Sequence, residues 1–265
     1  MHGRRMIVLA DAHVHLHDCA DPAVLLEAAA RNFRTHAPRE RWTGALLLAE
    51  TAGRSWFDEV RRANGAVAGP WRVERGSDED TLVAACGRAR LAIVAGCQVV
   101  AAERVEVLAL LTRERIPDGL TLDATIAAAL GSGGIAVLPW GVGKWLGARG
   151  RRVIAALESW AGQPVYAGDN ASRPWPWPEP AAFEVARRAG RAVLPGTDPL
   201  PLRGAERRVG SYGVRIEAIA ATATVLRALL AGGAPPALHA FGGPDAPWRV
   251  LGEQLRLRAA QGRAA

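Results

Sequence analysis

Lysine is almost absent from this 265-residue chain, in which Lys144 is the single example and arginine supplies the other 32 of the 33 basic residues. The formal net charge is +7, but basic residues stand one or two at a time among acidic ones, and no run of five like charges occurs. Proteins that bind nucleic acid concentrate basic residues in an arm or a patch. We therefore expect no nucleic-acid partner.

Cysteine and long apolar runs are also scarce. The three cysteines, Cys19, Cys86 and Cys97, form no Cys-x-x-Cys pair, and an odd number favours a reducing cytoplasm over a disulfide framework. The apolar run at residues 6–10 ends at Asp11 and is too short for a signal peptide. No stretch reaches the ~18 apolar residues of a membrane span. The expectation is a cytoplasmic protein without a membrane segment.

Short apolar runs alternate with helical stretches along the chain. Strands are expected at residues 6–10, 44–49, 91–95, 135–138, 165–167 and 192–194, and helices at 22–33, 122–130, 151–160, 181–189 and 218–231. Residues 105–111 are expected to pair back as a hairpin after the third strand. Such alternation predicts a largely parallel sheet.

The strand ends favour a barrel over an open sheet. No Gly-x-Gly-x-x-Gly motif opens a helix after the first strand, as an open dinucleotide-binding sheet would require. Several strands end in polar residues, and a barrel collects the carboxyl ends of its strands at one face. With 49% hydrophobic and 22% charged residues, the composition is that of an ordinary globular protein. We predict one domain over residues 1–265, a distorted (β/α) barrel related to the TIM barrel, and an open doubly wound sheet is the alternative.

Two histidines and one aspartate are the candidate metal ligands. His13 and His15 lie two apart at the end of the first strand, so their side chains point to the same face. Imidazoles side by side suit a borderline divalent metal. Asp198 follows the strand at 192–194 and can bind metal or accept a proton from a coordinated water. The alternatives are polar strand exits and an ordinary Asx turn before Pro199.

Five further polar residues follow strands and are candidates for the same site. Lys144 supplies a compact ammonium, although chance retention of one surface lysine is an equal alternative. Asp169 is a catalytic candidate, and Asn170 in the same segment is a candidate for substrate binding, whereas both also suit a turn. Arg173 and Arg208 present forked donors that bind phosphate or carboxylate, unless they are solvated surface residues.

The order of these motifs resembles that of the PHP (polymerase and histidinol phosphatase) family. Asp-Ala-His-Val-His-Leu-His at residues 11–17 resembles the family's first His-x-His motif, and Val-Leu-Pro-Gly-Thr-Asp-Pro at 193–199 resembles its late Ser-Asp-x-His strand. The resemblance spans most of residues 6–200. It implies a metal-dependent phosphoesterase on a distorted seven-stranded α/β barrel.

This chain departs from the family pattern where further ligands stand: Glu50 and Thr51 replace an Asp-His pair, Gln98 a glutamate, Pro139 and Trp140 a His-Pro pair, and Leu200 the last histidine. The resemblance therefore implies one divalent ion (Zn, Mn or Fe) rather than three. His13, His15 and Asp198 would hold it, with Glu50 or Gln98 assisting.

The function expected from these motifs is hydrolysis of a small-molecule substrate, and the resemblance makes that substrate a phosphoester. The amidohydrolase family also begins with His-x-His, has a late Asp and in some members uses a Lys after a middle strand, so an amide or lactone is the second possibility. A non-catalytic barrel that binds a ligand or a partner is the rival from another class, because several family ligands are replaced.

Overall fold

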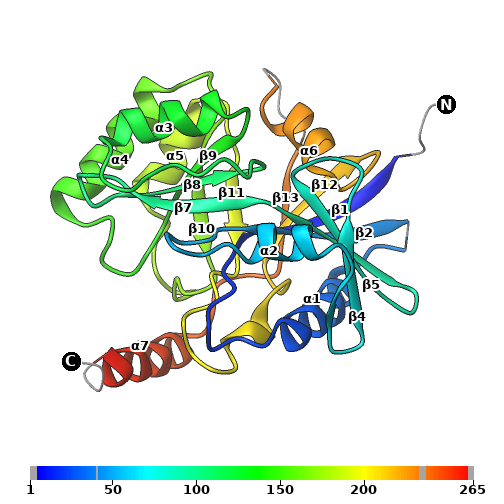
Figure 1. Ribbon diagram of the computed structural model, residues 1–265. Coiled ribbons are helices and arrows are strands. Elements are labelled where there is room, and N and C mark those ends of the chain that lie inside the picture. The colour runs from blue at the N-terminus through cyan, green and yellow to red at the C-terminus, as the bar shows by residue number, and fades with distance from the viewer. Residues whose placement is uncertain (1–4, 40, 233–236, 262–265) are drawn as a thin grey trace.

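The computed structural model describes residues 5–39, 41–232 and 237–261, which form two β-sheets with helices against their faces (Figure 1). The larger sheet has eight strands in the order β13 (His239–Phe241), β12 (Gly213–Ala218), β1 (Met6–Val14), β2 (Trp42–Leu48), β6 (Ala89–Val94), β5 (Thr81–Cys86), β4 (Trp71–Arg75) and β3 (Ala66–Ala68). The smaller sheet has five, in the order β11 (Val193–Gly196), β10 (Val165–Asn170), β9 (Ile135–Pro139), β8 (Glu106–Leu110) and β7 (Gly96–Val100).

Parallel pairing is confined to the middle of each sheet. β1, β2 and β6 are parallel to one another, as are β9, β10 and β11. The remaining ladders are antiparallel, including the β7–β8 hairpin that the sequence predicts. Each predicted strand overlaps one of these six parallel strands. The mixed α/β class is thus confirmed.

A closed barrel is not confirmed, because backbone contacts between the edges of the two sheets, among the described residues, are confined to two seams. At one seam a single parallel bridge joins Glu50, just after β2, to Cys97 of β7. At the other, the amide nitrogen of Asp198 donates to the carbonyl oxygen of His13 at 2.8 Å, and no ladder joins β1 to β11 in the described part of the chain. The structure therefore shows a mixed α/β fold of two sheets that face each other, and the predicted barrel closure is not confirmed.

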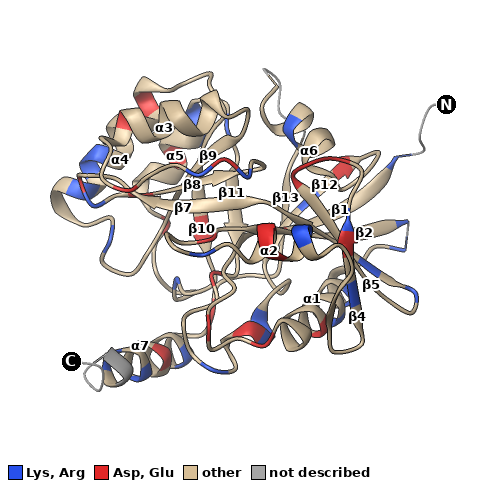
Figure 2. Ribbon diagram, viewed as in Figure 1, with Lys and Arg blue, Asp and Glu red and all other residues tan. Residues whose placement is uncertain are grey.

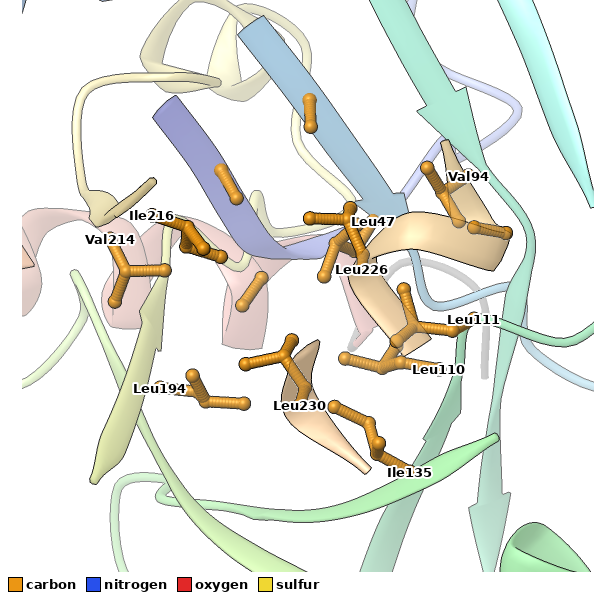
Figure 3. Close-up of a cluster of buried hydrophobic side chains, with 14 of the residues drawn as sticks. Leu47, Val94, Leu110, Leu111, Ile135, Leu194, Val214, Ile216, Leu226 and Leu230 are labelled. Carbon is orange, nitrogen blue, oxygen red and sulfur yellow. The ribbon is translucent and has the colours of Figure 1, made fainter. Parts of the chain in front are cut away.

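The main apolar core lies between the two sheets. It is built from β1 (Val8, Ala10, Ala12), β2 (Ala45, Leu47), β8 and β9 (Leu108, Leu110, Ile135, Val137) and β11 and β12 (Leu194, Val214, Ile216). Leu226 and Leu230 of α6 (Ala223–Leu230) complete this cluster (Figure 3). In β1, Leu9 points the other way, into a second cluster, as the period of two in a strand requires.

Helices cover the outer faces of both sheets. α1 (Pro22–His36) packs on the larger sheet, and it starts where the Asp21 side chain accepts from the amide nitrogen of Ala23, with Pro22 at the first helical position. α3 (Leu122–Gly131), α4 (Gly147–Ser159) and α5 (Ala181–Arg188) pack on the smaller sheet. The other helices are α2 (Trp56–Ala63), the 3₁₀ turn η1 (Ala205–Arg208) and α7 (Pro247–Gln261).

Charged residues are dispersed over these elements. Figure 2 shows basic and acidic residues interspersed on helices and strand ends in both halves of the molecule. Among the helices in the described ranges, none has the length and apolar composition needed to cross a membrane.

Candidate metal-binding active site

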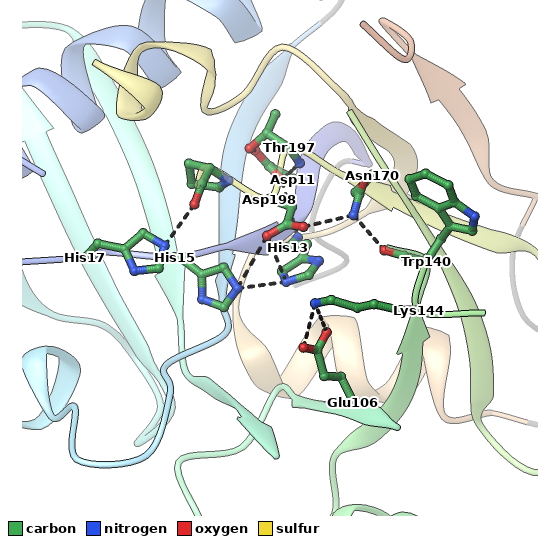
Figure 4. Close-up of polar contacts among 11 residues, drawn as sticks. Asp11, His13, His15, His17, Glu106, Trp140, Lys144, Asn170, Thr197 and Asp198 are labelled. Carbon is green, nitrogen blue, oxygen red and sulfur yellow. Dashed lines mark hydrogen bonds and ion pairs between the residues drawn. The ribbon is translucent and has the colours of Figure 1, made fainter. Parts of the chain in front are cut away.

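His13, His15 and Asp198 meet at the β1–β11 seam. The Nε2 atoms of the two histidines are 3.0 Å apart, and the Asp198 Oδ1 atom lies 3.6 Å from His13 Nε2 and 3.5 Å from His15 Nε2. Both histidines are buried (Figure 4). Within the described ranges, these three side chains form a group of possible metal ligands with their ligand atoms within 4.8 Å of one another. The structure thus brings together the three residues proposed as ligands from the sequence.

The seam is tight because glycine occupies the contact point on β11. A Cβ atom added to Gly196 would lie 2.3 Å from the amide nitrogen of His13, which is far inside van der Waals contact. On β1, the register against β2 shifts between Asp11 and Val14, next to the first histidine. Irregularities of this kind re-aim side chains beside active sites.

A buried carboxylate ties the two ligand segments together. Asp11 accepts from the amide nitrogen of Thr197 at 2.9 Å, the hydroxyl of Thr197 at 2.6 Å, the amide of Gly210 at 2.9 Å and the amide of His13 at 3.3 Å. Burial raises the pKa of Asp11 to about 6, although these four donors oppose the shift. Asp11 thereby connects the backbone of His13 to Thr197, the residue before Asp198.

Asp198 is held in a strained backbone conformation. Its φ is 45°, in the left-handed region that L-residues other than glycine rarely adopt. Its Oδ2 atom accepts from the Nδ2 atom of Asn170 at 2.8 Å, and the same Nδ2 atom donates to the carbonyl oxygen of Trp140 at 2.7 Å. Backbone strain is frequent at functional sites, where the surrounding structure maintains it. Here Asn170 leaves Oδ1 of Asp198 facing the histidines.

The protonation states suit a metal site. Burial, followed by the neighbouring His13, lowers the pKa of His15 to about 3, so this imidazole is neutral at pH 7. Burial alone would raise the pKa of Asp198, but His13, His15 and the charges on Lys144 and Arg208 hold it below its usual value. Metal ligation requires a neutral imidazole and an ionised carboxylate.

Lys144 lies beside this cluster and is fixed by a glutamate that the sequence analysis did not identify. Its Nζ atom donates to both carboxylate oxygens of Glu106 at 2.6 Å, and Figure 4 shows the ammonium between Glu106 and the histidines. Glu106 is the first residue of β8, whose other residues are apolar. A charged residue in an otherwise apolar strand was the feature of the sequence that could have identified it. The ammonium lies close enough to lower the pKa of Asp198.

Three other candidates are engaged in ion pairs. Arg173 binds Asp169 through two parallel hydrogen bonds of 2.8 and 2.7 Å, and the Tyr212 hydroxyl donates to the same carboxylate at 2.8 Å. Arg208 is bound by Asp245 and by Glu253 of α7. These contacts pair Asp169, Arg173 and Arg208 with other residues of the protein. Their assignment to catalysis or substrate binding stays a prediction.

Glu50 is not part of the group of ligand atoms found in the described ranges. Glu50 accepts from the amide nitrogen of Phe57 at 2.9 Å and pairs with Arg115, so its carboxylate serves the start of α2. Gln98 is half-buried on β7, and its side chain makes no hydrogen bond to a residue in the described ranges. Glu50 therefore does not join the imidazole–carboxylate group, whereas the assisting role of Gln98 stays a prediction.

Comparison with solved structures relates the fold to known crystal structures. PsfC from Pseudomonas syringae PB-5123 matches with a TM-score of 0.58 and 16% identity, over 97% of this chain and 99% of that chain. The lesion-specific endonuclease PfuEndoQ from Pyrococcus furiosus matches with a TM-score of 0.54 and 14% identity, over 86% of this chain and 56% of that chain. No family model and no curated protein sequence matches the chain. At these identities the likeness shows a shared fold, and it covers almost the full length of PsfC.

Proposed function

We propose that the protein is a divalent-metal-dependent hydrolase of small-molecule phosphate esters. The observation that carries the proposal is the triangle formed by His13, His15 and Asp198. In a tetrahedral site with bonds of ~2.0–2.2 Å, ligand atoms stand ~3.3–3.6 Å apart. The two nitrogen–oxygen separations, 3.5 and 3.6 Å, fall in this range, and the two imidazole nitrogens are 3.0 Å apart. A shift of a few tenths of an ångström between the imidazoles would complete one face of a metal tetrahedron.

Three protein ligands are the number that catalytic zinc sites use, with the fourth position left to water or substrate. A bound divalent ion would lower the pKa of a coordinated water toward ~7 and so supply a nucleophile at neutral pH. Asp198 suits the ligand role because Asn170 occupies its Oδ2 atom and directs Oδ1 toward the histidines. Zn, Mn and Fe are the candidate ions.

Lys144 is the residue that we assign to the substrate's negative charge. Its ammonium is held by Glu106 next to the triangle, so it needs no reorganisation when charge develops on a phosphoryl oxygen. A preorganised cation beside a metal favours an anionic substrate over a neutral amide or lactone. The fold shared with an endonuclease and the PHP resemblance of the first and last motifs support a phosphoester. The interspersed basic and acidic residues favour a small molecule over nucleic acid.

The test is hydrolysis of a panel of phosphomonoesters by the purified protein with added Zn²⁺, Mn²⁺ or Fe²⁺. We expect turnover that a chelator abolishes and that His15→Ala removes. His239→Ala is the matched control, because it removes an exposed imidazole from β13 and should leave turnover unchanged. Turnover that is indifferent to chelator, or equal in the two variants, would contradict a metal-dependent mechanism. Absence of turnover with every ester, together with a bound metal, would contradict the phosphoester assignment.

A further inference from the structure

We propose that a tryptophan-lined pocket beside the candidate metal centre binds an aromatic group of the substrate, so that the protein acts on aromatic phosphoesters. This inference rests on the proposed function, because it names the substrate class of the same site. The pocket has a volume of about 430 Å³, within the ~300–1,000 Å³ range of small-molecule sites. Trp140, Trp145 and Trp177 line it, together with Ile154, Pro178 and Arg151.

The pocket and the metal triangle share a wall, which is the segment that follows β9. The carbonyl oxygen of Trp140 accepts from Asn170, the same amide that holds Asp198, whereas the Trp140 indole lines the pocket. Figure 4 shows this indole pointing away from the histidines. A few residues on, Lys144 reaches the metal side and the adjacent Trp145 lines the pocket. Gly141 lines the pocket and lies against the Lys144 side chain, which links the two sites. On this proposal the phosphate contacts Lys144 and the organic part contacts the indoles.

The tryptophan residues that line the pocket are fixed in position by packing in the core and by a buried ion pair. Trp140 is only 6% exposed, and the Trp145 ring packs edge-to-face on Phe183 of α5 with centroids 5.8 Å apart. Arg173, fixed by Asp169, donates from Nη1 to the carbonyl oxygen of Trp177 at 3.1 Å. Asp169 and Arg173, predicted from the sequence as site residues, thus act as positioning residues for this wall.

Trp177 is the pocket residue whose exposed surface a ligand would cover. Its side chain is 53% exposed although it lines the pocket, so binding a flat ring would remove apolar surface from water. Two charged residues line the pocket: Glu179, which pairs with Arg187, and Arg151, which makes no ion pair with a residue in the described ranges. The unpaired charge is therefore positive, which disfavours a cationic ring. The class of ligand is therefore a neutral or anionic aromatic group attached to phosphate.

Calorimetric titration with two non-hydrolysable phosphonates tests the inference directly. Benzylphosphonate carries the ring, and ethylphosphonate has the same head group without it; each is titrated into the full chain with and without Zn²⁺. We expect benzylphosphonate to bind about tenfold more tightly, the effect of one stacked ring. Trp177→Ala should abolish this preference and Trp177→Phe should retain most of it. Trp175→Ala is the matched control, because Trp175 is exposed in the same loop but does not line the pocket.

Equal affinities in the wild type, absence of binding, or a preference that survives Trp177→Ala would each overturn the inference. Hydrolysis of benzyl phosphate and ethyl phosphate is measured separately on the same samples. A ring preference in binding without turnover of either ester would contradict the proposed function and leave the aromatic site supported. Turnover of both esters at equal efficiency would contradict the aromatic site alone.

Discussion

The buried pair between Asp169 and Arg173 offers a sharp test of how the site is supported. Both side chains are less than a tenth exposed, and the two hydrogen bonds of 2.8 and 2.7 Å are parallel. Replacing Arg173 with Met leaves the Asp169 carboxylate buried with two donors among the described residues, the Tyr212 hydroxyl and the Asn170 backbone amide. Breaking a buried pair from one side costs ~3–5 kcal/mol.

This loss in the free energy of unfolding should produce a measurable decrease in thermal stability. Each kcal/mol shifts the Tm of a protein of this size by ~2–4 °C, so Arg173→Met should lower the Tm by about 10 °C. Arg187→Met is the control, because Arg187 makes a similar two-fold contact with Glu179 at 2.9 and 3.0 Å on the surface. Exposed pairs contribute ~0–1 kcal/mol, so the Tm of this control should fall by no more than ~3 °C.

Differential scanning calorimetry of both variants tests the structural role of the Asp169–Arg173 pair. Metal content is measured on the same samples. Arg173→Met should bind metal normally once folded, since Arg173 touches none of the three ligands. Equal Tm values for the two variants would refute the structural role that we assign to the pair. A normal Tm with complete loss of turnover would instead support the predicted roles of Asp169 and Arg173 at the active site.

Three further predictions concern the site itself. Lys144→Gln should lower kcat on a phosphoester by about 10²-fold without changing metal content, because it removes a preorganised charge. Gly196→Ala should abolish metal binding, because the added Cβ would push β11 away from His13. Gly131→Ala in α3 is the control, because its added Cβ meets nothing within 4 Å, and it should leave metal binding intact. Equal metal content in the two variants would contradict the close contact between Gly196 and His13. The His15 pKa of about 3 lies below its unfolded value, so its contribution to stability is present above pH 6.5 and is lost as pH falls toward 3. Urea unfolding of the metal-free protein at pH 4 and pH 7 should show this loss, and His15→Gln should reduce it.

The repeating part of the fold follows from the sequence because it depends on local patterns. Apolar runs such as residues 44–49 and 135–138 are buried on both faces, which is why they stand out without any tertiary information. The strands β3 to β5 were not predicted, although Trp71 and Val73 of β4 alternate with exposed Arg72. β4 is short and carries Arg72 and Glu74 on its exposed face, so its pattern resembles that of a loop, whereas β3 and β5 are apolar runs of three and six residues that the sequence analysis did not identify. How the two sheets meet depends on contacts between distant segments, and the sequence leaves that open.

The same distinction explains the candidate site. His13 and His15 share one strand end, and the turn that contains Asp198 follows a buried strand, so their convergence could be predicted. The engagement of Glu50 could not, because its partner Arg115 lies 65 residues away. Glu106 and Lys144, 38 residues apart, meet only when β8 lies beside the segment after β9. Pairing of charges between elements is a tertiary property.

The central claim is that His13, His15 and Asp198 hold one divalent ion. The most direct measurement is the anomalous scattering of crystals grown with Zn²⁺. The account predicts one strong peak per chain, ~2.0–2.2 Å from the two Nε2 atoms and from Oδ1 of Asp198. A map with no peak between these atoms at saturating Zn²⁺, or with the ion bound only by other residues, would contradict it.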